Sequence, residues 1–260
     1  MSIKDELGNR MKTNYEQIPK LRLTRRTPVI IRIDGKAFHT FTKKFKKPFD
    51  HILMDTMQLT MKFLCENIQG CMLGYTQSDE ISLLLTDYTT FETQPWFDYE
   101  VQKICSISAS MATLAFNKEF TRMANNYIDT TMEAWNISDD EKKYMETLEK
   151  AMAMGAMFDS RCFNIPKEEV TNYFYWRQLD ATRNSIQMVG QANFSQKQLH
   201  GKSCNVIQDM LHEEKGINWN DFSIPEKRGA CCIKTESGWA IDNSIPIFKG
   251  DEREYIEKLI

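Results

Sequence analysis

One short apolar run constrains the fold more than any other segment of the chain. Pro28 precedes five residues, Val29 to Ile33, that are mostly β-branched and apolar, and Asp34-Gly35 ends the run. Valine and isoleucine favour strands, and an apolar run that stops at a turn dipeptide is typical of a buried strand with a sharp exit. The run therefore predicts a strand inside a sheet, with an aspartate directly after it.

The following segments predict a helix, a hairpin and further helices. A helix is expected from Pro48 to about Asn67, because its apolar residues suit helical packing and Gly70 stops it. Residues 71–75 and 80–85 are two apolar runs around a polar turn, which predicts a hairpin. Further helices are expected over 99–118, 167–191 and 195–215, an inserted helical excursion over 119–150, and short strands at 156–158 and 230–234.

Without the inserted excursion, the expected order of elements is β-α-β-β-α-β. This is the ferredoxin-like split arrangement of an α+β protein, with added helices in the C-terminal half. Polymerase palms and nucleotide cyclases have this arrangement, and so do many proteins with unrelated functions. The fold alone therefore does not determine the activity.

Composition sets bounds on the class of protein. Of the 260 residues, 42% are hydrophobic and 27% are charged, as in soluble globular proteins. No apolar run approaches the roughly 20 residues of a membrane helix, and charges near the N-terminus argue against a signal peptide. We therefore expect a cytoplasmic protein without a membrane segment. The seven cysteines contain no Cys-x-x-Cys pair and are expected to be reduced.

Charge is unevenly distributed along the chain. Residues 1–50 contain 13 Lys/Arg against 5 Asp/Glu, a balance of +8, which leaves −11 for residues 51–260. Such asymmetry is compatible with a face that meets phosphate groups. It is equally compatible with a basic surface that is only solvated.

Two acidic sites are predicted to meet at one edge of the sheet. Asp34 ends the first strand, and Asp79-Glu80 lies at the turn between the second and third strands. The first and third strands of a split βαβ sheet are neighbours, so these residues are expected to lie close together. Carboxylates are ligands that Mg²⁺ prefers, and two such ions about 4 Å apart can clamp the oxygens of a phosphoryl transfer. Each site alone is also an ordinary turn sequence.

Several sequence motifs are more specific than the two turn sequences. The chain reads RIDGKAFH at residues 32–39, FKKPFD at 45–50, GYTQSDEIS at 74–82, FDSRCF at 158–163, YFYWRQLD at 173–180, LHGKS at 199–203 and GINW at 216–219. In order and spacing, these motifs resemble those of the tRNA(His) guanylyltransferase family over roughly residues 10–235. The resemblance implies a nucleotidyltransferase of the polymerase-palm type that acts on the 5′ end of tRNA.

The resemblance also implies roles for individual residues. Two Mg²⁺ ions would be held by the side chains of Asp34 and Asp79 and the carbonyl of Gly35, and Glu80 would be a supporting catalytic residue. Phe38 and His39 would lie nearest the base, and Ser78 and Lys47 would bind the triphosphate. The full set implied to bind the nucleotide is Asp34, Gly35, Lys36, Ala37, Phe38, His39, Lys47, Ser78, Asp79 and Asn184.

RNA contacts are expected from basic residues, some with aromatic neighbours. The expected set is Arg25, Arg26, Lys43, Lys44, Arg177, Arg183 and Lys202, with Arg22, Lys46, Trp176, Lys227 and Arg228 as further candidates. Residues 1–165 would form the palm-type core with the metal and nucleotide sites. Residues 166–260 would form a helical part that completes the core and contacts tRNA. The family resemblance further implies a homotetramer that uses ATP and GTP as substrates.

One block departs from the enzymes that add a single G to tRNA(His). Those enzymes carry D-C-H-I-N-N-L-Y-N after W-R-Q, whereas this chain reads DATRNSIQ at residues 180–187, with Thr182 at the histidine position. This form resembles the branch that extends 5′-truncated tRNA by templated 3′-to-5′ addition, after activation of the 5′ end by ATP or GTP. Template-directed repair is therefore the expected function, and dedicated guanylylation of tRNA(His) is the alternative.

Two further alternatives come from other classes. A nucleotide cyclase can be built on the same palm, but the turn reads Gln-Ser-Asp-Glu and lacks the cyclase signature. A catalytically inert RNA-binding protein is the other alternative, and the presence of both Asp34 and Asp79 argues against it.

Overall fold

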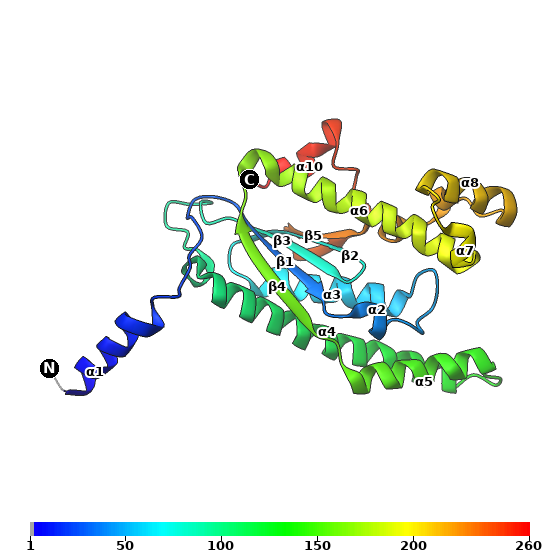
Figure 1. Cartoon of the computed structure of the whole chain (residues 1–260), viewed down its shortest axis with the longest axis horizontal. Coiled ribbons are helices and arrows are strands. Elements are labelled where there is room, and N and C mark those ends of the chain that lie inside the picture. Colours follow the sequence, from blue (N-terminus) through cyan, green and yellow to red (C-terminus); the bar gives the residue numbers. More distant parts are fainter. Residues whose placement is uncertain (1–2) are drawn as a thin grey trace.

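The computed structural model describes residues 3–260, with side chains described from residue 6. Within them, one antiparallel sheet has the strand order β4-β1-β3-β2-β5-β6 (Figure 1). The strands are β1 (Val29–Gly35), β2 (Cys71–Gln77), β3 (Glu80–Leu85), β4 (Phe158–Asn164), β5 (Ala230–Thr235) and β6 (Gly238–Asp242). The first four have the 4-1-3-2 order of the ferredoxin-like arrangement, so the predicted palm-like α+β fold is confirmed.

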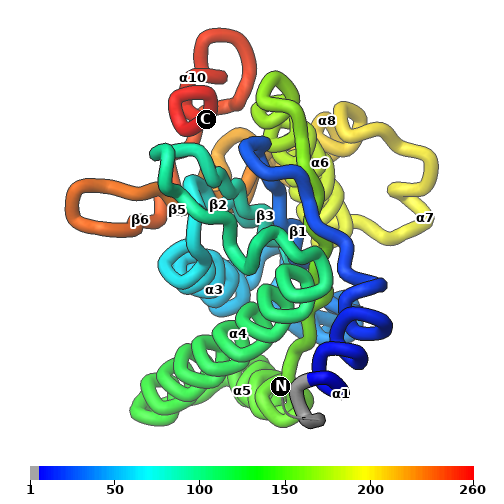
Figure 2. The backbone as a smooth tube through the Cα atoms, turned by 90° about the vertical axis from the view of Figure 1, so that its left-hand side faces the viewer, coloured from blue at the N-terminus to red at the C-terminus, as the bar shows by residue number. Residues whose placement is uncertain are grey.

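Long helices cover both faces of the sheet. On one face lie α3 (His51–Asn67) and α4 (Val101–Met132), and α5 (Asp139–Met154) returns along α4. The opposite face is covered by α6 (Lys167–Asn193) (Figures 1 and 2). Strand β1 is buried on both sides, because Ile31 and Ile33 pack toward α3 and α4 while Ile30 packs toward α6. This two-sided burial explains why its sequence is a continuous apolar run.

Shorter elements complete the structure. They are α1 (Ile3–Met11), α2 (Phe38–Phe41), α7 (Gln196–Leu199), α8 (Cys204–Lys215), α9 (Ile224–Arg228) and α10 (Glu254–Glu257). Helix α1 projects away from the body of the molecule, and α8 packs against the C-terminal half of α6 (Figure 1). Strand β5 pairs with β2, so part of the chain after residue 166 is built into the same sheet.

The registers of the strands confirm the predicted meeting of the acidic residues. Asp34 on β1 lies opposite Glu80 on β3, and the backbone N–H of Gly35 donates to the carbonyl of Asp79 over 3.1 Å. On its other side, β1 pairs with β4, which places Asp34 opposite Asp159. The end of β1 and the β2–β3 turn are therefore in direct backbone contact.

Several element boundaries differ from the predictions. Helix α4 continues to Met132, and α5 follows it, because no glycine or proline interrupts residues 101–132. Strand β4 begins at Phe158, not at residue 156, since the Asn117 amide binds both the N–H and the carbonyl of Ala156 and holds it in a loop. Strand β6 and helix α1 were not predicted. The predicted strand at 156–158 overlaps β4 only at Phe158, because the polar residues of this edge strand form no apolar run.

Two findings bear on the class of protein. Among residues 3–260, no helix is long and apolar enough to span a membrane. The seven cysteines are free, and the Sγ atoms of Cys105 and Cys162 lie 3.7 Å apart.

Candidate functional site

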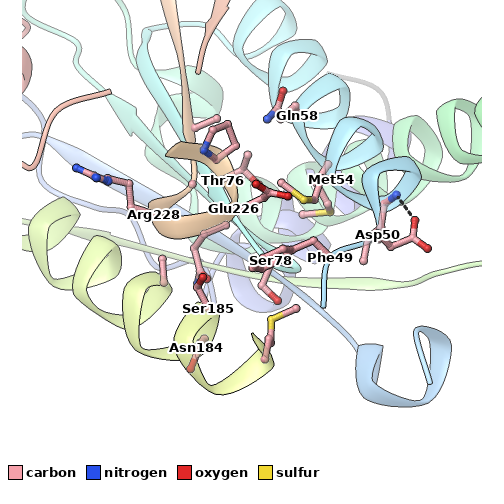
Figure 3. A pocket seen from close by; sticks show the side chains of 18 residues that line it. Phe49, Asp50, Met54, Gln58, Thr76, Ser78, Asn184, Ser185, Glu226 and Arg228 are labelled. Carbon is pink, nitrogen blue, oxygen red and sulfur yellow. Dashed lines mark hydrogen bonds between the residues drawn. The ribbon is translucent and has the colours of Figure 1, made fainter. Parts of the chain in front are cut away.

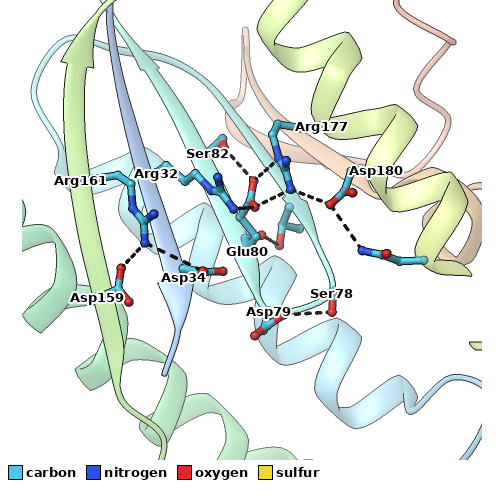
Figure 4. Close-up of polar contacts among 12 residues, drawn as sticks. Arg32, Asp34, Ser78, Asp79, Glu80, Ser82, Asp159, Arg161, Arg177 and Asp180 are labelled. Carbon is cyan, nitrogen blue, oxygen red and sulfur yellow. Dashed lines mark hydrogen bonds and ion pairs between the residues drawn. The ribbon is translucent and has the colours of Figure 1, made fainter. Parts of the chain in front are cut away.

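The candidate site lies at the end of the sheet where β1 stops and β2 turns into β3 (Figure 4). Ser78 and Asp79 form the two-residue turn, and Ser78 has a φ of 50°. Ala37, which follows the end of β1, has a φ of 54°. Left-handed backbone at residues other than glycine is uncommon, and such positions gather at functional sites. Both residues border the same cleft.

Asp34 and Asp79 are two carboxylates close enough for their negative charges to repel each other. Burial raises the pKa of Asp79, the hydroxyl of Ser78 opposes this by donating to Oδ1 over 3.0 Å, and the charge of Asp34 raises the pKa further. A guanidinium nitrogen of Arg161 lies 4.0 Å from Asp34 Oδ2, but only 2.7 Å from Asp159 Oδ1. The pair therefore has an electrostatic preference for an added cation.

Gly35 sits where no side chain fits. A Cβ there would collide with the ring of Phe38, which packs on Phe41, Phe116 and Phe158 with centroid distances of 5.2–5.5 Å. Phe38 is only 4% exposed. The ring therefore packs mainly into the core while it borders the cleft, and the implied place of Phe38 next to the base stays a prediction.

A cleft of about 600 Å³ opens between the end of β1, the β2–β3 turn and the segment that follows α2. We call it the Asp79 cleft. It brings together Gly35, Ala37, Phe38, His39, Lys47, Ser78 and Asp79, all of which were predicted to bind the nucleotide. The side chain of Asp34 is about one-third exposed, and Lys36 donates its backbone N–H to Met157 over 2.8 Å. These two residues stand beside the cleft without lining it.

The lysines at the mouth of the cleft belong to a fixed segment. Asp50 is buried and accepts the N–H groups of Lys46 and Leu53 over 3.0 and 3.1 Å, and the hydroxyl of Tyr144 over 2.6 Å. The ammonium of Lys46 lies over the rings of Tyr127 and Tyr144, at 4.5 and 4.4 Å from the centroids. Lys47, by contrast, lines the cleft and has no ion pair among residues 6–260, whose side chains the structure describes. The segment can thus present Lys47 to an anion.

Glu80 is the centre of a buried ion network (Figure 4). Its carboxylate accepts two bonds of 2.8 Å from Arg177 on α6 and lies 2.7 Å from a guanidinium nitrogen of Arg32. Arg177 also binds Asp180 over 2.9 Å. Burial raises the pKa of Glu80, and both guanidinium groups oppose that shift. The network ties α6 to the β2–β3 turn.

The expected RNA contacts fall into separate groups. Arg177 was expected to contact RNA, but it is 4% exposed and its guanidinium is engaged by Glu80, so the structure contradicts that expectation. Lys43, Lys44, Arg183 and Lys202 are exposed at or near the end of the sheet that carries the carboxylates. Arg25 and Arg26 precede β1 and lie at the opposite end, where Arg25 pairs with Asp98 and Arg26 binds the carbonyls of Thr90 and Phe91.

Asn184, the last residue expected to bind the nucleotide, lines a second cavity (Figure 3). This cavity measures about 90 Å³ and shares Asp50, Leu53, Ser78 and Met188 with the Asp79 cleft. We call it the Gln77 cavity, after a buried residue of its wall. Sequence reasoning assigned no role to Gln77, although it lies inside one of the motifs, or to Tyr127 and Tyr144, whose helices carry no motif.

The arrangement suits a polyphosphate held with hard cations. Residues 3–260 contain no group of three or more His, Cys, Asp or Glu side chains that could form a metal cage. Two carboxylates and a backbone carbonyl fit an ion that also takes phosphate oxygens and water, as Mg²⁺ does. Lys47 and the hydroxyl of Ser78 border the same space. The site therefore has the donors for a nucleoside triphosphate with its metal ions.

Comparison with known proteins identifies relatives of this arrangement. The family model described as tRNAHis guanylyltransferase matches residues 8–166. A solved bacterial tRNA(His) guanylyltransferase-like protein in complex with ATP is 46% identical, with a TM-score of 0.82 over 98% of this chain and 99% of that one. A second such bacterial protein, in complex with GTP, is 40% identical, with a TM-score of 0.75 over 98% and 99% of the two chains.

A sequence relative agrees with the structural ones. The tRNA(His) guanylyltransferase of Saccharomyces cerevisiae is 26% identical over 216 residues, which cover 78% of this chain and 80% of the yeast protein. The matched region contains Asp34, the β2–β3 turn and the whole of β4. The chain therefore belongs to the tRNA(His) guanylyltransferase family and is a nucleotidyltransferase.

Proposed function

We propose that this chain adds nucleotides to the 5′ end of tRNA in the 3′-to-5′ direction, with the opposing strand as template. The observation that carries the proposal is the block at residues 180–187, where Thr182 replaces the histidine of the enzymes that add a single G. The block lies on α6, and its Asn184 reaches the cavity next to the Asp79 cleft. The similarity to a bacterial guanylyltransferase-like protein that was solved with ATP supports this proposal.

The residues of the site fit two Mg²⁺ ions. The like charges of Asp34 and Asp79, together with the raised pKa of Asp79, are the observations that favour a cation there. The two carboxylates and the Gly35 carbonyl would hold the ions, which when bound would neutralise charge on the reacting phosphates. Lys47 would bind triphosphate oxygens as a point charge, and Ser78 would turn its hydroxyl from Asp79 to a phosphate.

The proposed reaction is a phosphoryl transfer at the 5′ end of the RNA. A 5′ monophosphate oxygen first attacks the α-phosphorus of ATP or GTP and displaces pyrophosphate, so that AMP or GMP becomes the activating group, unless the end already carries a triphosphate, whose pyrophosphate then plays that part. The 3′-hydroxyl of the incoming nucleotide then attacks the 5′ phosphorus, a new 3′-oxygen–phosphorus bond forms, and the activating group leaves. The side chains of the cleft contribute by holding both partners in line, because alignment of bound reactants can supply a large part of the rate enhancement.

The tRNA would lie over the end of the sheet that carries the carboxylates. Lys43, Lys44, Arg183 and Lys202 are exposed there and would bind its phosphates. Arg25 and Arg26 lie at the other end of the sheet and could reach the same tRNA only from another subunit. We therefore propose a homotetramer in which one tRNA contacts more than one copy of the chain.

The experiment that tests the function is a change of the template base. The chain is incubated with Mg²⁺, all four nucleoside triphosphates and 5′-truncated tRNAs of several identities, and the product 5′ ends are sequenced. Changing the opposing base from C to A should switch the added nucleotide from G to U. Continued addition of G, confined to tRNA(His), would instead establish the alternative of a dedicated guanylyltransferase, which the family model and the yeast relative favour.

A further inference from the structure

We infer that Trp176 stacks on an unpaired base of the RNA strand that lies opposite the 5′ end being extended. The inference rests on the proposed function, in which that strand is the template. A tRNA with a truncated 5′ end leaves bases of the opposite strand unpaired beside the reacting end, so their faces are open to stacking. Trp176 lies outside the Asp79 cleft, and the reaction itself gives it no role.

The indole ring of Trp176 is held in one place. The guanidinium carbon of Arg177 lies over the ring, 4.4 Å from its centroid. That guanidinium is itself fixed, because it donates two bonds of 2.8 Å to Glu80 and one of 2.9 Å to Asp180. The ring of Tyr173 adds a T-shaped contact with a centroid distance of 5.9 Å. The indole therefore has a rigid support that does not depend on a ligand.

The same ring is largely open to solvent. Trp176 is 52% exposed, and Leu179 beside it on α6 is also half exposed. Trp135 is 99% exposed in the turn between α4 and α5, where its ring has almost no contact with the protein. A ring that is held on one face and free on the other loses little conformational freedom when a base stacks on it. Trp176 thus has the properties of a stacking platform, and Trp135 does not.

Trp176 is linked to the end of the sheet that carries the carboxylates. Its ring packs on Arg177, Arg177 binds Glu80, and Glu80 lies opposite Asp34 in the register of β1 and β3. Figure 4 shows Arg177 reaching from α6 to Glu80 on the sheet. A base stacked on the indole would therefore belong to a nucleotide close to the reacting 5′ end.

The surroundings of the ring suit an RNA strand. Tyr173 contacts both Trp176 and Phe163 of β4, which places the indole on the β4 side of α6. On that side, Arg161 of β4 and Arg183 of α6 are exposed. Each pairs with an aspartate through one nitrogen, so both keep N–H donors for phosphate oxygens. An aromatic ring beside guanidinium groups is the combination with which proteins bind single-stranded nucleic acid.

Stacking would hold the strand without reading it. Every nucleobase has an aromatic face, so a tryptophan accepts all four bases, whereas hydrogen bonds to a base edge select among them. A template strand must be accepted whatever its sequence is. The edge of the base that is being copied must also stay free to pair with the incoming nucleotide. A platform at Trp176 meets both conditions.

Equilibrium binding of two RNA hairpins tests the inference. Both mimic an acceptor stem with a truncated 5′ end and carry unpaired 3′ overhangs of equal length. One overhang consists of abasic nucleotides, so the hairpins differ in bases and not in phosphate charge. The unaltered chain should bind the hairpin with bases about tenfold more tightly, which corresponds to about 1.4 kcal/mol. Trp176→Ala should remove this preference and bind the abasic hairpin within about twofold of the unaltered chain.

Three further variants sharpen the result. Trp176→Phe keeps an aromatic ring and should retain a preference of about threefold or more, whereas Trp176→Leu keeps an apolar side chain without a ring and should lose it. Their comparison carries the test if Trp176→Ala fails to fold. Trp135→Ala removes an exposed tryptophan outside the site and should bind both hairpins like the unaltered chain.

Two outcomes would overturn the inference. In the first, Trp176→Ala keeps the preference for the hairpin with bases; if size-exclusion chromatography then shows a changed number of copies in the assembly, the ring belongs to an interface between copies of this chain. In the second, Trp176→Ala weakens the binding of both hairpins equally, which would mean that the ring acts on the fold and not on a base.

Failure of the proposed function would look different. Templated addition to truncated tRNA by the unaltered chain is measured separately. If addition follows the opposing base while Trp176→Ala keeps the binding preference, the stacking site fails and the function stands. If the binding preference depends on Trp176 but the added nucleotide ignores the opposing base, the proposed function fails, and Trp176 remains a site for unpaired RNA bases.

Discussion

Asp79 and Glu80 are neighbours in the chain, yet their surroundings are opposite. The carboxylate of Glu80 is buried and is matched by two guanidinium groups, from Arg177 and Arg32. The carboxylate of Asp79 faces the cleft, accepts one hydroxyl and shares its region with the like charge of Asp34. Asp79 belongs to the turn and Glu80 is the first residue of β3, so neighbouring residues meet two different electrostatic environments.

This difference assigns a structural role to Glu80 and a role in the reaction to Asp79. A charge whose hydrogen bonds are already satisfied holds α6 against the sheet, and it has little capacity for a ligand. Among the described side chains, the Asp34–Asp79 pair has only the guanidinium of Arg161 at ion-pair distance, 4.0 Å from Asp34 and closer to Asp159, so it keeps capacity for a further cation, which fits residues that meet a metal-bound substrate. The two halves of the turn should therefore respond to substitution in opposite ways, one losing activity and the other losing stability.

The largest effect is expected at the carboxylate pair. Asp34→Asn and Asp79→Asn should each slow nucleotide addition by about 1000-fold or more, as expected when roughly 4 kcal/mol of charge stabilisation is lost. Both variants should keep the fold, since neither side chain is part of the core. The measurement is the single-turnover rate of addition to truncated tRNA, beside circular dichroism. Rates within a few-fold of the unaltered chain would contradict the two-metal assignment.

The second effect concerns stability and the other half of the turn. Arg177→Met should reduce the free energy of unfolding by about 3–5 kcal/mol, because it leaves Glu80 buried with one partner fewer. Urea denaturation measures it. Arg161→Met is the matched control, because that guanidinium is half exposed and should matter by less than about 1 kcal/mol. Equal losses in the two variants would mean that the Glu80 network is not the main tie between α6 and the turn.

The sequence predicted the part of the site that depends on strand order. A continuous apolar run, a polar turn and the handed topology of the split sheet suffice to bring Asp34 to Asp79, and the structure places them together. The same reasoning could not predict that the side chain of Glu80 is buried while that of Asp79 is partly exposed. Nor could it recognise Arg177 as an interior residue, because its partner is 97 positions away in the chain.

Other features escaped prediction for different physical reasons. A strand was predicted at 156–158, but its continuation to Asn164 was not, because the edge strand β4 carries polar residues that hide its period; β6 is half-buried along its whole length. The contact of Tyr144 with Asp50 joins α5 to the lysine segment across 94 positions, and no local pattern reveals it. Contacts between polar groups that are far apart in the chain are thus the features that could not be predicted from the sequence.

A third, smaller effect tests the rim of the cleft. Lys47→Ala should raise the KM for nucleoside triphosphates about tenfold, as for the loss of one charge-assisted contact of roughly 1.5 kcal/mol, and should spare tRNA binding. Steady-state kinetics and a tRNA filter-binding assay measure the two quantities. Lys150→Ala on α5, where the lysine pairs with Glu146 at the surface, is the control. If tRNA affinity collapses while KM is unchanged, Lys47 belongs to the RNA surface.

The smallest predicted effect is a gain in thermal stability when Asp79 is replaced by asparagine. Burial, and then the charge of Asp34, raise the pKa of this carboxyl above its ordinary value. A carboxyl with a raised pKa in the folded state binds a proton more readily there than in the unfolded state. Its ionised form therefore disfavours folding above that pKa, and the penalty fades as the pH falls through it.

Asp79→Asn should consequently raise the thermal midpoint in EDTA at pH 7, even though it abolishes activity. The gain over the unaltered chain should shrink between pH 7 and pH 4, because protonation then removes the same charge from Asp79. Mg²⁺ should raise the midpoint of the unaltered chain more than that of the variant, since it relieves the repulsion that the amide has already removed. Asp140→Asn, at an exposed position on α5, should show neither response. A lower midpoint for Asp79→Asn at pH 7 would mean that this carboxylate, like that of Glu80, is already satisfied within the protein.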